Sequence, residues 1–453
     1  MAKLFGSSGV RGLVNVDLTP TLACSVASAV ATHAKAKKAL LGRDTRVSGG
    51  MIEAALVSGL LSCGVDVLLA GMVPTPVCAY AAKVLGADVG FMLTASHNPP
   101  PYNGIKVFNN NALSYTDADQ DAVERIVAQD HFALADWRTL GTTSAVDAEK
   151  VYMEMALNAV SLKKSWKVVV DPGCGAAFNI APKLLTALGC KVTALNAQPD
   201  GHFPARKSEP NAESLITLSN TVKALGADIG IAFDGDADRV AFVDENGFFV
   251  DFDRSLAAYS AYTLKRAGGG VIVTTIEASM AVETMAEKYA GKVARTRVGD
   301  IYVSEAIKRS GALFGGEPCG AWIQPQQHLC PDGPLSAVMF LAALEAEDKT
   351  VSEFVSEVPQ YITKRVNFSC KNESKYVLIE QLGTTLKEAF PDYTDYAIVD
   401  GARLALKNGW MLVRASGTEP LIRLTVEGES EAAAKDITAK ATALINKQIE
   451  AQK

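Results

Sequence analysis

The chain has 453 residues, of which 48% are apolar and 21% are charged, and its formal net charge is −6. This length predicts about three domains of ordinary soluble type, with two to four allowed. The acidic balance argues against a nucleic-acid surface as the main function. The longest uncharged apolar stretch, 67–82, contains Pro74 and Pro76 and is too short to span a membrane.

Cysteine usage and the first residues of the chain indicate where the protein works. Eight cysteines are scattered through the sequence, and no two have the C-x-x-C spacing of metal or redox sites. A chain of this size does not depend on disulfide bonds for its core. The first residues lead into a glycine-rich segment and not into an apolar targeting sequence. We therefore expect a reduced, cytoplasmic protein.

Along most of the chain, short β-branched runs alternate with alanine-rich segments of helical spacing. The expected strands cover 38–42, 65–69, 89–93, 167–171, 229–233, 240–243 and 271–275, and the expected helices include 51–61 and 181–188. This alternation predicts α/β units in which helices cover mostly parallel strands. The C-terminal region differs. A separate α+β domain is predicted there by strands at 397–399, 404–406, 411–413 and 421–426, a hairpin turn at Asn408-Gly409 and a helix over 431–449.

Two polar segments near the N-terminus are candidates for anion binding. The first, 5–12, is rich in glycine and serine, so its backbone N–H groups can wrap an anion that Arg11 also meets; a flexible terminus is the alternative. The second, 42–49, follows an expected strand and precedes a helix. Its arginines suit either ion pairs within the fold or the lining of a site, and we interpret them as structural.

A serine loop follows the apolar run 89–93, which is typical of a buried strand. Open α/β sheets bind ligands at the carboxyl ends of their strands. The hydroxyl of Ser96 is therefore a candidate nucleophile or phosphate carrier, and a turn without a chemical role is the alternative. The sequence of the loop is Thr94-Ala95-Ser96-His97-Asn98-Pro99-Pro100.

The residues that lead into this loop have a counterpart later in the chain. Residues 85–90 read LGADVG, and residues 225–230 read LGADIG. In each copy a glycine-capped helix end leads into a strand that delivers a polar loop. The first loop holds Ser96, and the second holds Asp234, Asp236 and Asp238. The recurrence indicates either an internal duplication or common helix–strand punctuation.

The second loop is a candidate metal site. Three carboxylates at alternate positions repel one another unless a cation holds them. Hard oxygen ligands suit Mg²⁺ or Ca²⁺, and Mg²⁺ would indicate phosphoryl chemistry. Glu245 stands twelfth from Asp234, but an EF-hand is excluded because Arg239 occupies the position that needs glycine and strand-like runs flank the loop. A solvated acidic turn is the alternative.

Two more loops have residues suited to a sugar phosphate. In 315–320, GGEPCG, Glu317 follows a strand expected at 312–314 and can accept hydrogen bonds from sugar hydroxyls or an amine. In 414–420, RASGTEP, an arginine, two hydroxyls and a glycine-permitted turn form a phosphate cradle that Arg423 can reinforce. Each loop by itself is also compatible with an ordinary turn.

Together and in this order, TASHNPP followed by NGIK at 103–106, DGDADR, GGEPCG and RASGTEP resemble the α-D-phosphohexomutase superfamily over the whole chain. The resemblance implies three similar α/β domains with mixed sheets and a smaller C-terminal α+β domain around a central cleft. We place these domains at 1–148 with the serine loop, 149–250 with the acidic loop, 251–364 with the sugar-recognition loop and 365–453 with the phosphate cradle.

The resemblance also implies a reaction and a role for each loop. Ser96 would carry the phosphate and would bind one Mg²⁺ together with Asp234, Asp236 and Asp238. A hexose phosphate would exchange its phosphate between O6 and O1 through a hexose 1,6-bisphosphate, which would also serve as activator. Catalytic contacts are expected from Arg11, His97, Lys106 and Arg239. Substrate contacts are expected from Glu317, Cys319, Asp300, Arg414, Ser416, Gly417, Thr418 and Arg423.

Two residues depart from the family's pattern. Cys319 stands where the family often has serine, and Ala321 stands where it often has histidine. Cysteine is a weaker hydrogen-bond partner and alanine cannot carry a proton. Lys106 and His97 therefore remain as candidates for the acid/base role, and His328 is close in sequence but cannot be placed.

The expected substrate follows from residues 297–303, RVGDIYV, which resemble the phosphoglucosamine mutase group. Asp300 could meet the ammonium of glucosamine phosphate, or it could cap a helix. Glucosamine 6-phosphate is therefore favoured, with phosphomannomutase or phosphoglucomutase activity as the alternative. We expect a small-molecule sugar phosphate as the partner, with no nucleic acid and no membrane; the sequence leaves monomer or homodimer open.

Two functions from other classes compete with this one. A phosphatase of the haloacid-dehalogenase type would use Asp234 as its nucleophile, but it leaves the Ser96 and Arg414 loops without a role. A non-catalytic sugar-phosphate-binding protein would not need both a metal loop and a nucleophile loop.

Overall fold

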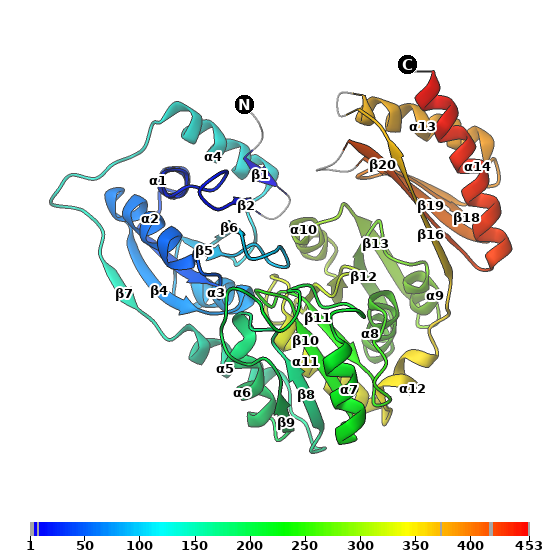
Figure 1. Cartoon of the computed structure of the whole chain (residues 1–453), viewed down its shortest axis with the longest axis horizontal. Coiled ribbons are helices and arrows are strands. Elements are labelled where there is room, and N and C mark those ends of the chain that lie inside the picture. Colours follow the sequence, from blue (N-terminus) through cyan, green and yellow to red (C-terminus); the bar gives the residue numbers. More distant parts are fainter. Residues whose placement is uncertain (1–3, 7–8, 372–373, 416–419, 452–453) are drawn as a thin grey trace.

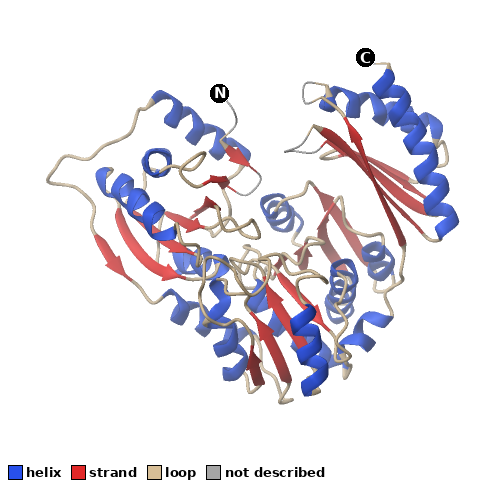
Figure 2. Ribbon diagram, viewed as in Figure 1, coloured by secondary structure: helices blue, strands red, loops and turns tan. Residues whose placement is uncertain are grey.

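The computed structural model describes residues 4–6, 9–371, 374–415 and 420–451. Among these residues, each of four sheets belongs to a different part of the chain, and helices pack beside each sheet (Figures 1 and 2). Ser7 and Ser8 of the glycine-rich segment 5–12, and Ser416, Gly417 and Thr418 of the predicted phosphate cradle, lie outside the described residues. No helix in the described ranges has the length and apolar character needed to cross a membrane.

The first sheet has the order β1-β2-β6-β5-β3-β4-β7. Its strands β3, β4, β5 and β7 are parallel, whereas β6 runs antiparallel to both β5 and β2. The strands are β1 (Phe5–Gly6), β2 (Gly9–Leu13), β3 (Lys38–Arg43), β4 (Asp66–Met72), β5 (Val89–Leu93), β6 (Tyr102–Asn109) and β7 (Thr143–Ala145). The helices are α1 (Pro20–Ala34), α2 (Gly49–Ser62), α3 (Thr75–Val84) and α4 (Asp117–Gln129).

Strands β3 and β5 are covered on both faces, as their uninterrupted apolar character requires. Ala39 and Leu41 belong to a buried cluster with residues of α1 and α2, while Leu40 belongs to a cluster with residues of α3. Alternate side chains of one strand therefore meet helices on opposite faces, which makes a three-layer arrangement.

The second and third sheets are also mixed. The second has the order β11-β10-β8-β9 and the third β13-β12-β14-β15, and in each an antiparallel strand joins a parallel set. The second region contains α5 (Ala148–Ala159), β8 (Lys167–Asp171), α6 (Ile180–Ala187), β9 (Lys191–Ala194), α7 (Ile216–Leu225), β10 (Ile229–Phe233) and β11 (Val240–Val243), with a 3-10 turn at Ala176–Phe178. The third contains α8 (Phe252–Ala267), β12 (Gly270–Thr275), α9 (Ala281–Glu287), β13 (Gly291–Thr296), α10 (Asp300–Ser310), β14 (Phe314–Gly316), β15 (Trp322–Ile323), α11 (Gly333–Glu347) and α12 (Val351–Ser356).

The C-terminal region is an antiparallel sheet of order β16-β20-β19-β18-β17 with two helices. Its elements are β16 (Ile362–Ser369), α13 (Lys375–Ala389), β17 (Asp395–Ile398), β18 (Ala402–Leu406), β19 (Gly409–Ala415), β20 (Leu421–Gly428) and α14 (Glu431–Glu450). The architecture confirms the predicted fold class. A hairpin does join β18 and β19, but its turn lies one residue earlier than expected: Lys407 and Asn408 form it, and Gly409 is the first residue of β19, paired with Leu406.

The buried clusters show which regions form one body. One large cluster contains residues of α3, β8, β10, α8 and α11, so it runs through the first three regions. The C-terminal sheet has a separate core with its own two helices. The contact between this sheet and the third region is small and contains Ile276, Trp410 and Leu412.

The prediction of a strand at 312–314 is wrong in its position. Strand β14 covers Phe314–Gly316, so the two glycines assigned to a loop belong to the strand. A Cβ atom on Gly315 would lie 2.6 Å from Ile307 Cδ1 of α10. Glycine is needed at this place because the helix packs directly against the strand, and the loop begins only at Glu317.

The repeated segments at 85–90 and 225–230 occupy equivalent places. Gly86 and Gly226 have φ values of 67° and 56°, and each follows a helix and precedes a central strand, β5 or β10. Asp88 accepts a hydrogen bond from the Lys38 N–H, and Asp228 accepts one from the Lys167 N–H. The two strands therefore end at corresponding edges of their sheets, where Ser96 and Asp234 follow.

Candidate active site

Ser96 lies directly after β5 with a backbone that a non-glycine residue seldom adopts. Its φ is 49°, and the residue is buried. The hydroxyl Oγ donates a hydrogen bond to Asp234 Oδ2 at 2.7 Å, and His97 Nδ1 lies 3.3 Å from the same oxygen. The serine loop of the first region and the acidic loop of the second therefore meet at Ser96.

The contact between these loops requires a glycine. A Cβ atom on Gly235 would lie 2.5 Å from the Ser96 carbonyl oxygen, well inside van der Waals contact. Thr75, the first residue of α3, adds a second link, because its N–H donates to the Asp236 carbonyl and its hydroxyl donates to Asp236 Oδ2. Two segments of the first region, the serine loop and the start of α3, thus hold the acidic loop in place.

The three aspartates form a compact cluster. Asp234, Asp236 and Asp238 each offer an oxygen within 4.8 Å of the others. The Oδ1 atoms of Asp236 and Asp238 are buried and have no hydrogen-bond partner among the described residues. Oxygen donors of this kind, brought together and left with unpartnered atoms, fit a hard divalent cation such as Mg²⁺.

Lys106 provides positive charge at this cluster. Its Nζ donates to Asp236 Oδ2 at 2.7 Å and to Asp238 Oδ2 at 2.5 Å. Burial alone would lower the pKa of this buried lysine, but the two carboxylates raise it well above its usual value. Lys106 is therefore a cation that neutralises carboxylates, and its ammonium is not poised to act as a base.

The aspartates differ in their protonation. Burial, with the nearby charges of Asp238 and Asp236, raises the pKa of Asp234 well above its usual value. Burial would also raise the pKa of Asp236, but Lys106 outweighs it and the pKa is lowered. A second positive charge at the cluster would favour the ionised form of all three carboxylates.

Arg11 and His97 approach the same loop. Arg11 lies on β2, its Nη1 donates to Asn98 Oδ1 at 3.2 Å, and its Nε is buried with no partner among the described residues. Burial lowers the pKa of Arg11. Burial also lowers the pKa of His97, and the positive charges of Arg239 and Arg11 lower it further, to about 3. The imidazole of His97 is therefore neutral at physiological pH.

The acidic loop is joined to the loop that holds Glu317. Arg239 and Ala321 form an antiparallel bridge, and the Val240 N–H donates to the Gly320 carbonyl at 3.0 Å. Glu317 is buried, and burial followed by the charge of Asp300 raises its pKa to about 7. Burial likewise raises the pKa of Cys319 to about 12, so its thiol stays protonated. The side chains of Arg239, Glu317 and Cys319 are thus near enough to affect one another's charge.

Asp300 connects the third region to the first. It is the first residue of α10, and the N-cap is Gly299, so Asp300 is not the helix cap. Its Oδ2 accepts a hydrogen bond from Ser114 Oγ at 3.0 Å, while Oδ1 is buried with no partner in the described parts of the chain. The Gly299 N–H donates to Glu317 Oε2 at 3.0 Å, which places the two acidic residues side by side.

His328, which could not be placed from the sequence, is a buried structural residue. Its Nε2 lies 2.8 Å from Asp332 Oδ2, and its Nδ1 accepts a hydrogen bond from the Cys330 N–H. Tyr152 donates to the same aspartate at 2.6 Å. With both ring nitrogens used within the fold, His328 has no free nitrogen for a substrate.

Arg414 lies on β19 and Arg423 on the neighbouring strand β20, where they are paired across the sheet. Arg414 Nε lies 3.3 Å from Asp400 Oδ2, and Arg414 Nη1 forms an ion pair with Glu277 of the third region. The structure therefore places the two arginines of the predicted phosphate cradle together.

Sequence reasoning missed several residues that hold the site. Thr75 carried no signal, because a Thr-Pro pair at a helix start is ordinary. Arg206 donates to the Phe233 carbonyl at 2.7 Å and to Asp171 Oδ2 at 2.9 Å, and it therefore supports the strand before the acidic loop. The interpretation of segment 42–49 as structural agrees with the ion pairs of Arg43 with Glu53 and of Arg46 with Asp44. The length of β6, which carries Lys106, was also not predicted.

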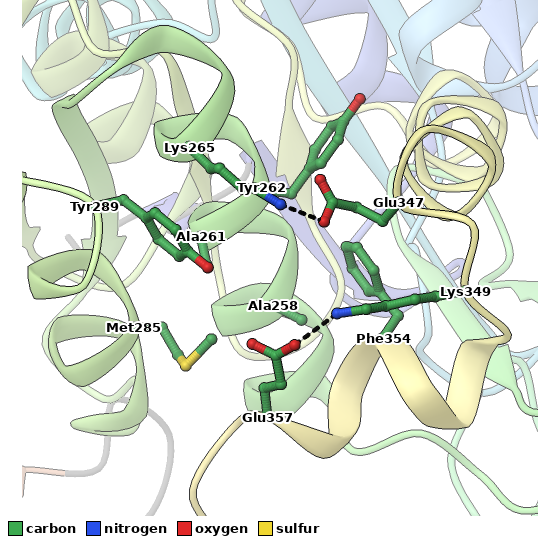
Figure 3. Close-up of a pocket in the computed structure, with 10 residues that line it drawn as sticks. All are labelled: Ala258, Ala261, Tyr262, Lys265, Met285, Tyr289, Glu347, Lys349, Phe354 and Glu357. Carbon is green, nitrogen blue, oxygen red and sulfur yellow. Dashed lines mark hydrogen bonds and ion pairs between the residues drawn. The ribbon is translucent and has the colours of Figure 1, made fainter.

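A small pocket between α8, α9 and α12 lies apart from these loops (Figure 3). Ion pairs between Lys265 and Glu347 and between Lys349 and Glu357, each 2.6 Å long, lie at its edge. None of the predicted site residues within the described ranges lines it. Its lining residues are Ala258, Ala261, Tyr262, Lys265, Met285, Tyr289, Glu347, Lys349, Phe354 and Glu357.

Family models match nearly the whole chain. Residues 2–134, 150–247 and 251–361 match the alpha/beta/alpha domains I, II and III of phosphoglucomutase/phosphomannomutase, and residues 366–444 match its C-terminal domain. The chain is 42% identical to a probable phosphoglucosamine mutase of Thermococcus kodakarensis over 449 residues, which are 99% of each chain. It is also 42% identical to a phosphoglucosamine mutase of Methanococcus vannielii over 452 residues, again 99% of each.

Solved structures share the fold. A phosphoglucomutase/phosphomannomutase family protein from Burkholderia thailandensis superposes with a TM-score of 0.89 at 28% identity, covering 98% of this chain and 97% of that one. The N-acetylphosphoglucosamine mutase of Aspergillus fumigatus, solved in complex with GlcNAc-6P and magnesium, has a TM-score of 0.59 at 16% identity. At that identity the likeness concerns the fold alone.

Proposed function

The chain belongs to the phosphoglucomutase/phosphomannomutase family of phosphohexomutases, and on that basis we propose that it interconverts glucosamine 6-phosphate and glucosamine 1-phosphate. The proposal extends to Ser96 as the phosphate carrier, to one Mg²⁺ and to a hexose 1,6-bisphosphate intermediate. The observation that carries it is the 2.7 Å contact of Ser96 Oγ with Asp234, which joins a buried hydroxyl to a cluster of three carboxylates.

The residues present can do this chemistry in two balanced steps. In the first, the bond between phosphorus and Ser96 Oγ breaks and a bond forms from phosphorus to the free hydroxyl oxygen of the substrate, giving a 1,6-bisphosphate, while the proton of that hydroxyl ends on Ser96 Oγ. The sugar then turns. In the second step the bond between its other phosphorus and the sugar oxygen breaks, a bond forms to Ser96 Oγ, and the proton of Ser96 ends on the sugar oxygen. Phosphoryl transfer needs alignment and charge neutralisation above all, which buried cations around one oxygen supply.

The aspartates would hold Mg²⁺, which when bound neutralises charge on the transferring phosphoryl oxygens. Arg11, Lys106 and Arg239 would add positive charge beside it. Of the two acid/base candidates, His97 is the better one, because its neutral ring nitrogen lies 3.3 Å from Ser96 Oγ while Lys106 is held as an ammonium by two carboxylates.

Two features support a sugar phosphate, and a glucosamine phosphate in particular. Glu317 and Asp300 lie side by side and offer acceptors for hydroxyls and for an ammonium, and the buried Oδ1 of Asp300 has no partner among the described residues. Arg414 and Arg423 would hold the phosphate that is not being transferred, with Cys319 and the loop residues Ser416, Gly417 and Thr418 as further contacts. The names of the archaeal relatives point to the same substrate.

The decisive experiment compares kcat/KM for the 1- and 6-phosphates of glucosamine, glucose and mannose, with Mg²⁺ and the matching 1,6-bisphosphate present. Glucosamine phosphates should be the best substrates. A preference for mannose or glucose phosphates would instead establish the phosphomannomutase/phosphoglucomutase alternative. Removal of Mg²⁺ by a chelator should abolish turnover, and added Mg²⁺ should restore it.

Peptide mapping after treatment with a 1,6-bisphosphate tests the carrier itself. Acid-stable phosphate on Ser96 is expected. Acid-labile phosphate on Asp234 would be the signature of a haloacid-dehalogenase-type reaction, and absence of phosphate from Ser96 in every preparation would overturn the proposed mechanism.

A further inference from the structure

Arg46 uses every hydrogen-bond donor that a guanidinium has. Its side chain is completely buried, and each of its five N–H groups has an acceptor between 2.7 and 3.0 Å away. One acceptor is a carboxylate, and the other four are backbone carbonyl oxygens of the serine loop and its exit. The acceptors are Asp44 Oδ2 and the carbonyl oxygens of Ser96, Asn98, Pro99 and Tyr102.

These bonds hold a strained backbone. Ser96 has a left-handed φ of 49°, which is costly for a residue with a side chain and persists only when its surroundings determine it. The Ser96 N–H donates to Thr94 Oγ1 at 2.8 Å, and Thr94 Oγ1 donates to Asp44 Oδ2 at 2.7 Å. Both peptide groups of Ser96 are therefore tied to the Asp44–Arg46 pair, one through Thr94 and the other through its own carbonyl.

Residues of the second region cover Arg46 and the serine loop. The Phe203 ring lies 5.2 Å from Arg46 Cζ, and Ser208 Oγ donates to the His97 carbonyl at 2.7 Å. A Cβ atom on Gly201 would lie 2.4 Å from the Thr45 carbonyl oxygen, so the covering segment is in direct contact with residues beside Arg46. Exclusion of water strengthens the hydrogen bonds of the guanidinium.

We propose that Arg46 is a positioning residue for phosphoryl transfer: it fixes the left-handed conformation that aims Ser96 Oγ at the acidic loop. This inference rests on the proposed role of Ser96 as the phosphate carrier. Arg46 itself touches no reacting atom, because its five donors are all used by Asp44 and by the carbonyl oxygens of the loop and its exit. Its removal should therefore slow the chemical step and leave the binding of substrate nearly unchanged.

Arginine is the one side chain that can serve these acceptors together. A lysine carries the same charge, but its three donors radiate from a single nitrogen and cannot reach carbonyls spread around a planar fork. Arg46→Lys preserves the charge opposite Asp44, so the buried carboxylate is not left without a counter-charge. The lysine variant therefore separates the geometry of the fork from its charge.

The test measures the full-length Arg46→Lys variant beside the wild type and Arg43→Lys. Arg43 lies in the same segment, but its side chain pairs with Glu53 and, within the described part of the chain, donates no hydrogen bond to the serine loop. For Arg46→Lys we expect kcat and the single-turnover rate of Ser96 phosphorylation by a hexose 1,6-bisphosphate to fall about 100-fold, with KM within about threefold. Arg43→Lys should equal the wild type in both quantities.

A second variant keeps the inference testable if Arg46→Lys does not fold. Thr94→Val keeps the shape of the side chain and removes the hydroxyl that links the Ser96 N–H to Asp44. It should lower kcat at least about tenfold at unchanged KM. Circular dichroism and the thermal midpoint establish that each variant is folded.

The outcomes separate this inference from its premise. A wild type that never carries phosphate on Ser96 overturns the proposed function and the role of Arg46 with it. A wild type that is phosphorylated, with a folded Arg46→Lys variant of equal kcat and equal phosphorylation rate, overturns the positioning role alone. A fall in kcat matched by an equal rise in KM would also overturn it, because that pattern indicates general damage to the site.

Discussion

At the scale of single residues, Ser96 combines a strained backbone with a hydroxyl that is bonded to a carboxylate. The loop compositions, and for Lys106 and Arg239 the family resemblance, made these residues candidates, and the structure brings Ser96, the three aspartates and Lys106 together. The sequence could not show how they are held. The Thr75 hydroxyl and the fork of Arg46 act through distances between segments far apart in the chain, and no local pattern encodes such distances.

Replacement of Ser96 by alanine tests the carrier role. We expect Ser96→Ala to reduce turnover by at least about 1,000-fold while the dissociation constant for the sugar phosphate changes less than about threefold, because the hydroxyl matters only in the transfer step. Steady-state kinetics and isothermal titration calorimetry measure the two quantities. Equal losses of affinity and rate would count against the role.

At the scale of elements, the proposed reaction would take place at the loops that follow β5 and β10. The sequence predicted both strands with correct bounds, since they are uninterrupted apolar runs that end at polar residues. It missed the extent of β6, which follows three prolines and begins with Tyr102, Asn103 and Gly104, residues more typical of a turn than of a strand. The residues at the start of β6 show no alternation of apolar and polar side chains, because its place within the sheet buries the strand on both faces.

Gly235 tests the contact between the two loops. A Cβ atom there would collide with the Ser96 carbonyl oxygen, so Gly235→Ala should push the loops apart and lower kcat about 100-fold. Gly50→Ala is the matched control, because Gly50 lies on α2 with nothing within 4 Å of the added atom. The control should keep full activity, and equal kcat in both variants would show that the loops tolerate separation.

The start of α8 predicts a pH dependence of stability. Asp253 accepts a hydrogen bond from the Ser279 N–H at 2.7 Å, and burial raises its pKa to about 7. In the unfolded chain the same group ionises near pH 4, at about its ordinary pKa. The folded state therefore keeps a proton that the unfolded state releases, so this group's contribution to stability is full below about pH 4 and declines until about pH 7.

Asp253→Asn removes this dependence, because the amide keeps the acceptor oxygen and does not titrate. Its thermal midpoint should exceed that of the wild type at pH 7 and above, and the difference should vanish toward pH 4. Differential scanning calorimetry across this range measures it. A difference that is the same at both ends would contradict the raised pKa.

At the scale of the whole molecule, the first three regions share a core and the C-terminal sheet has its own. Length predicted about three regions, strand spacing predicted the distinct character of the last one, and the division into four came from the family resemblance. Their mutual placement was not predicted, because contacts such as Ser114 with Asp300 or Glu277 with Arg414 join residues more than a hundred positions apart. A single sequence carries no signal for such pairs.

The ion pair of Glu277 with Arg414 predicts that replacing either residue changes the affinity for substrate in opposite directions. If Arg414 holds a substrate phosphate, Glu277 competes for it. Glu277→Gln should then lower KM by up to about fivefold, the range expected for a partly exposed ion pair. Arg414→Ala should raise KM at least about tenfold with a smaller change in kcat, since its charged hydrogen bonds act before and during transfer. KM values that move in the same direction in both variants would exclude the competition.

The separate core of the C-terminal sheet has a consequence for how a sugar could turn within one site. The loops that hold Ser96 and the three aspartates stand on a body that is continuous through three regions, while Arg414 and Arg423 stand on a body attached through the few residues around Ile276 and Trp410. On the proposed mechanism, the C-terminal sheet can release the phosphate that is not being transferred without disturbing the alignment of the other phosphate with Ser96. Retention and release of the bisphosphate would then depend on how tightly the C-terminal sheet packs against the first three regions. They would not depend on the groups that make and break the bonds to phosphorus.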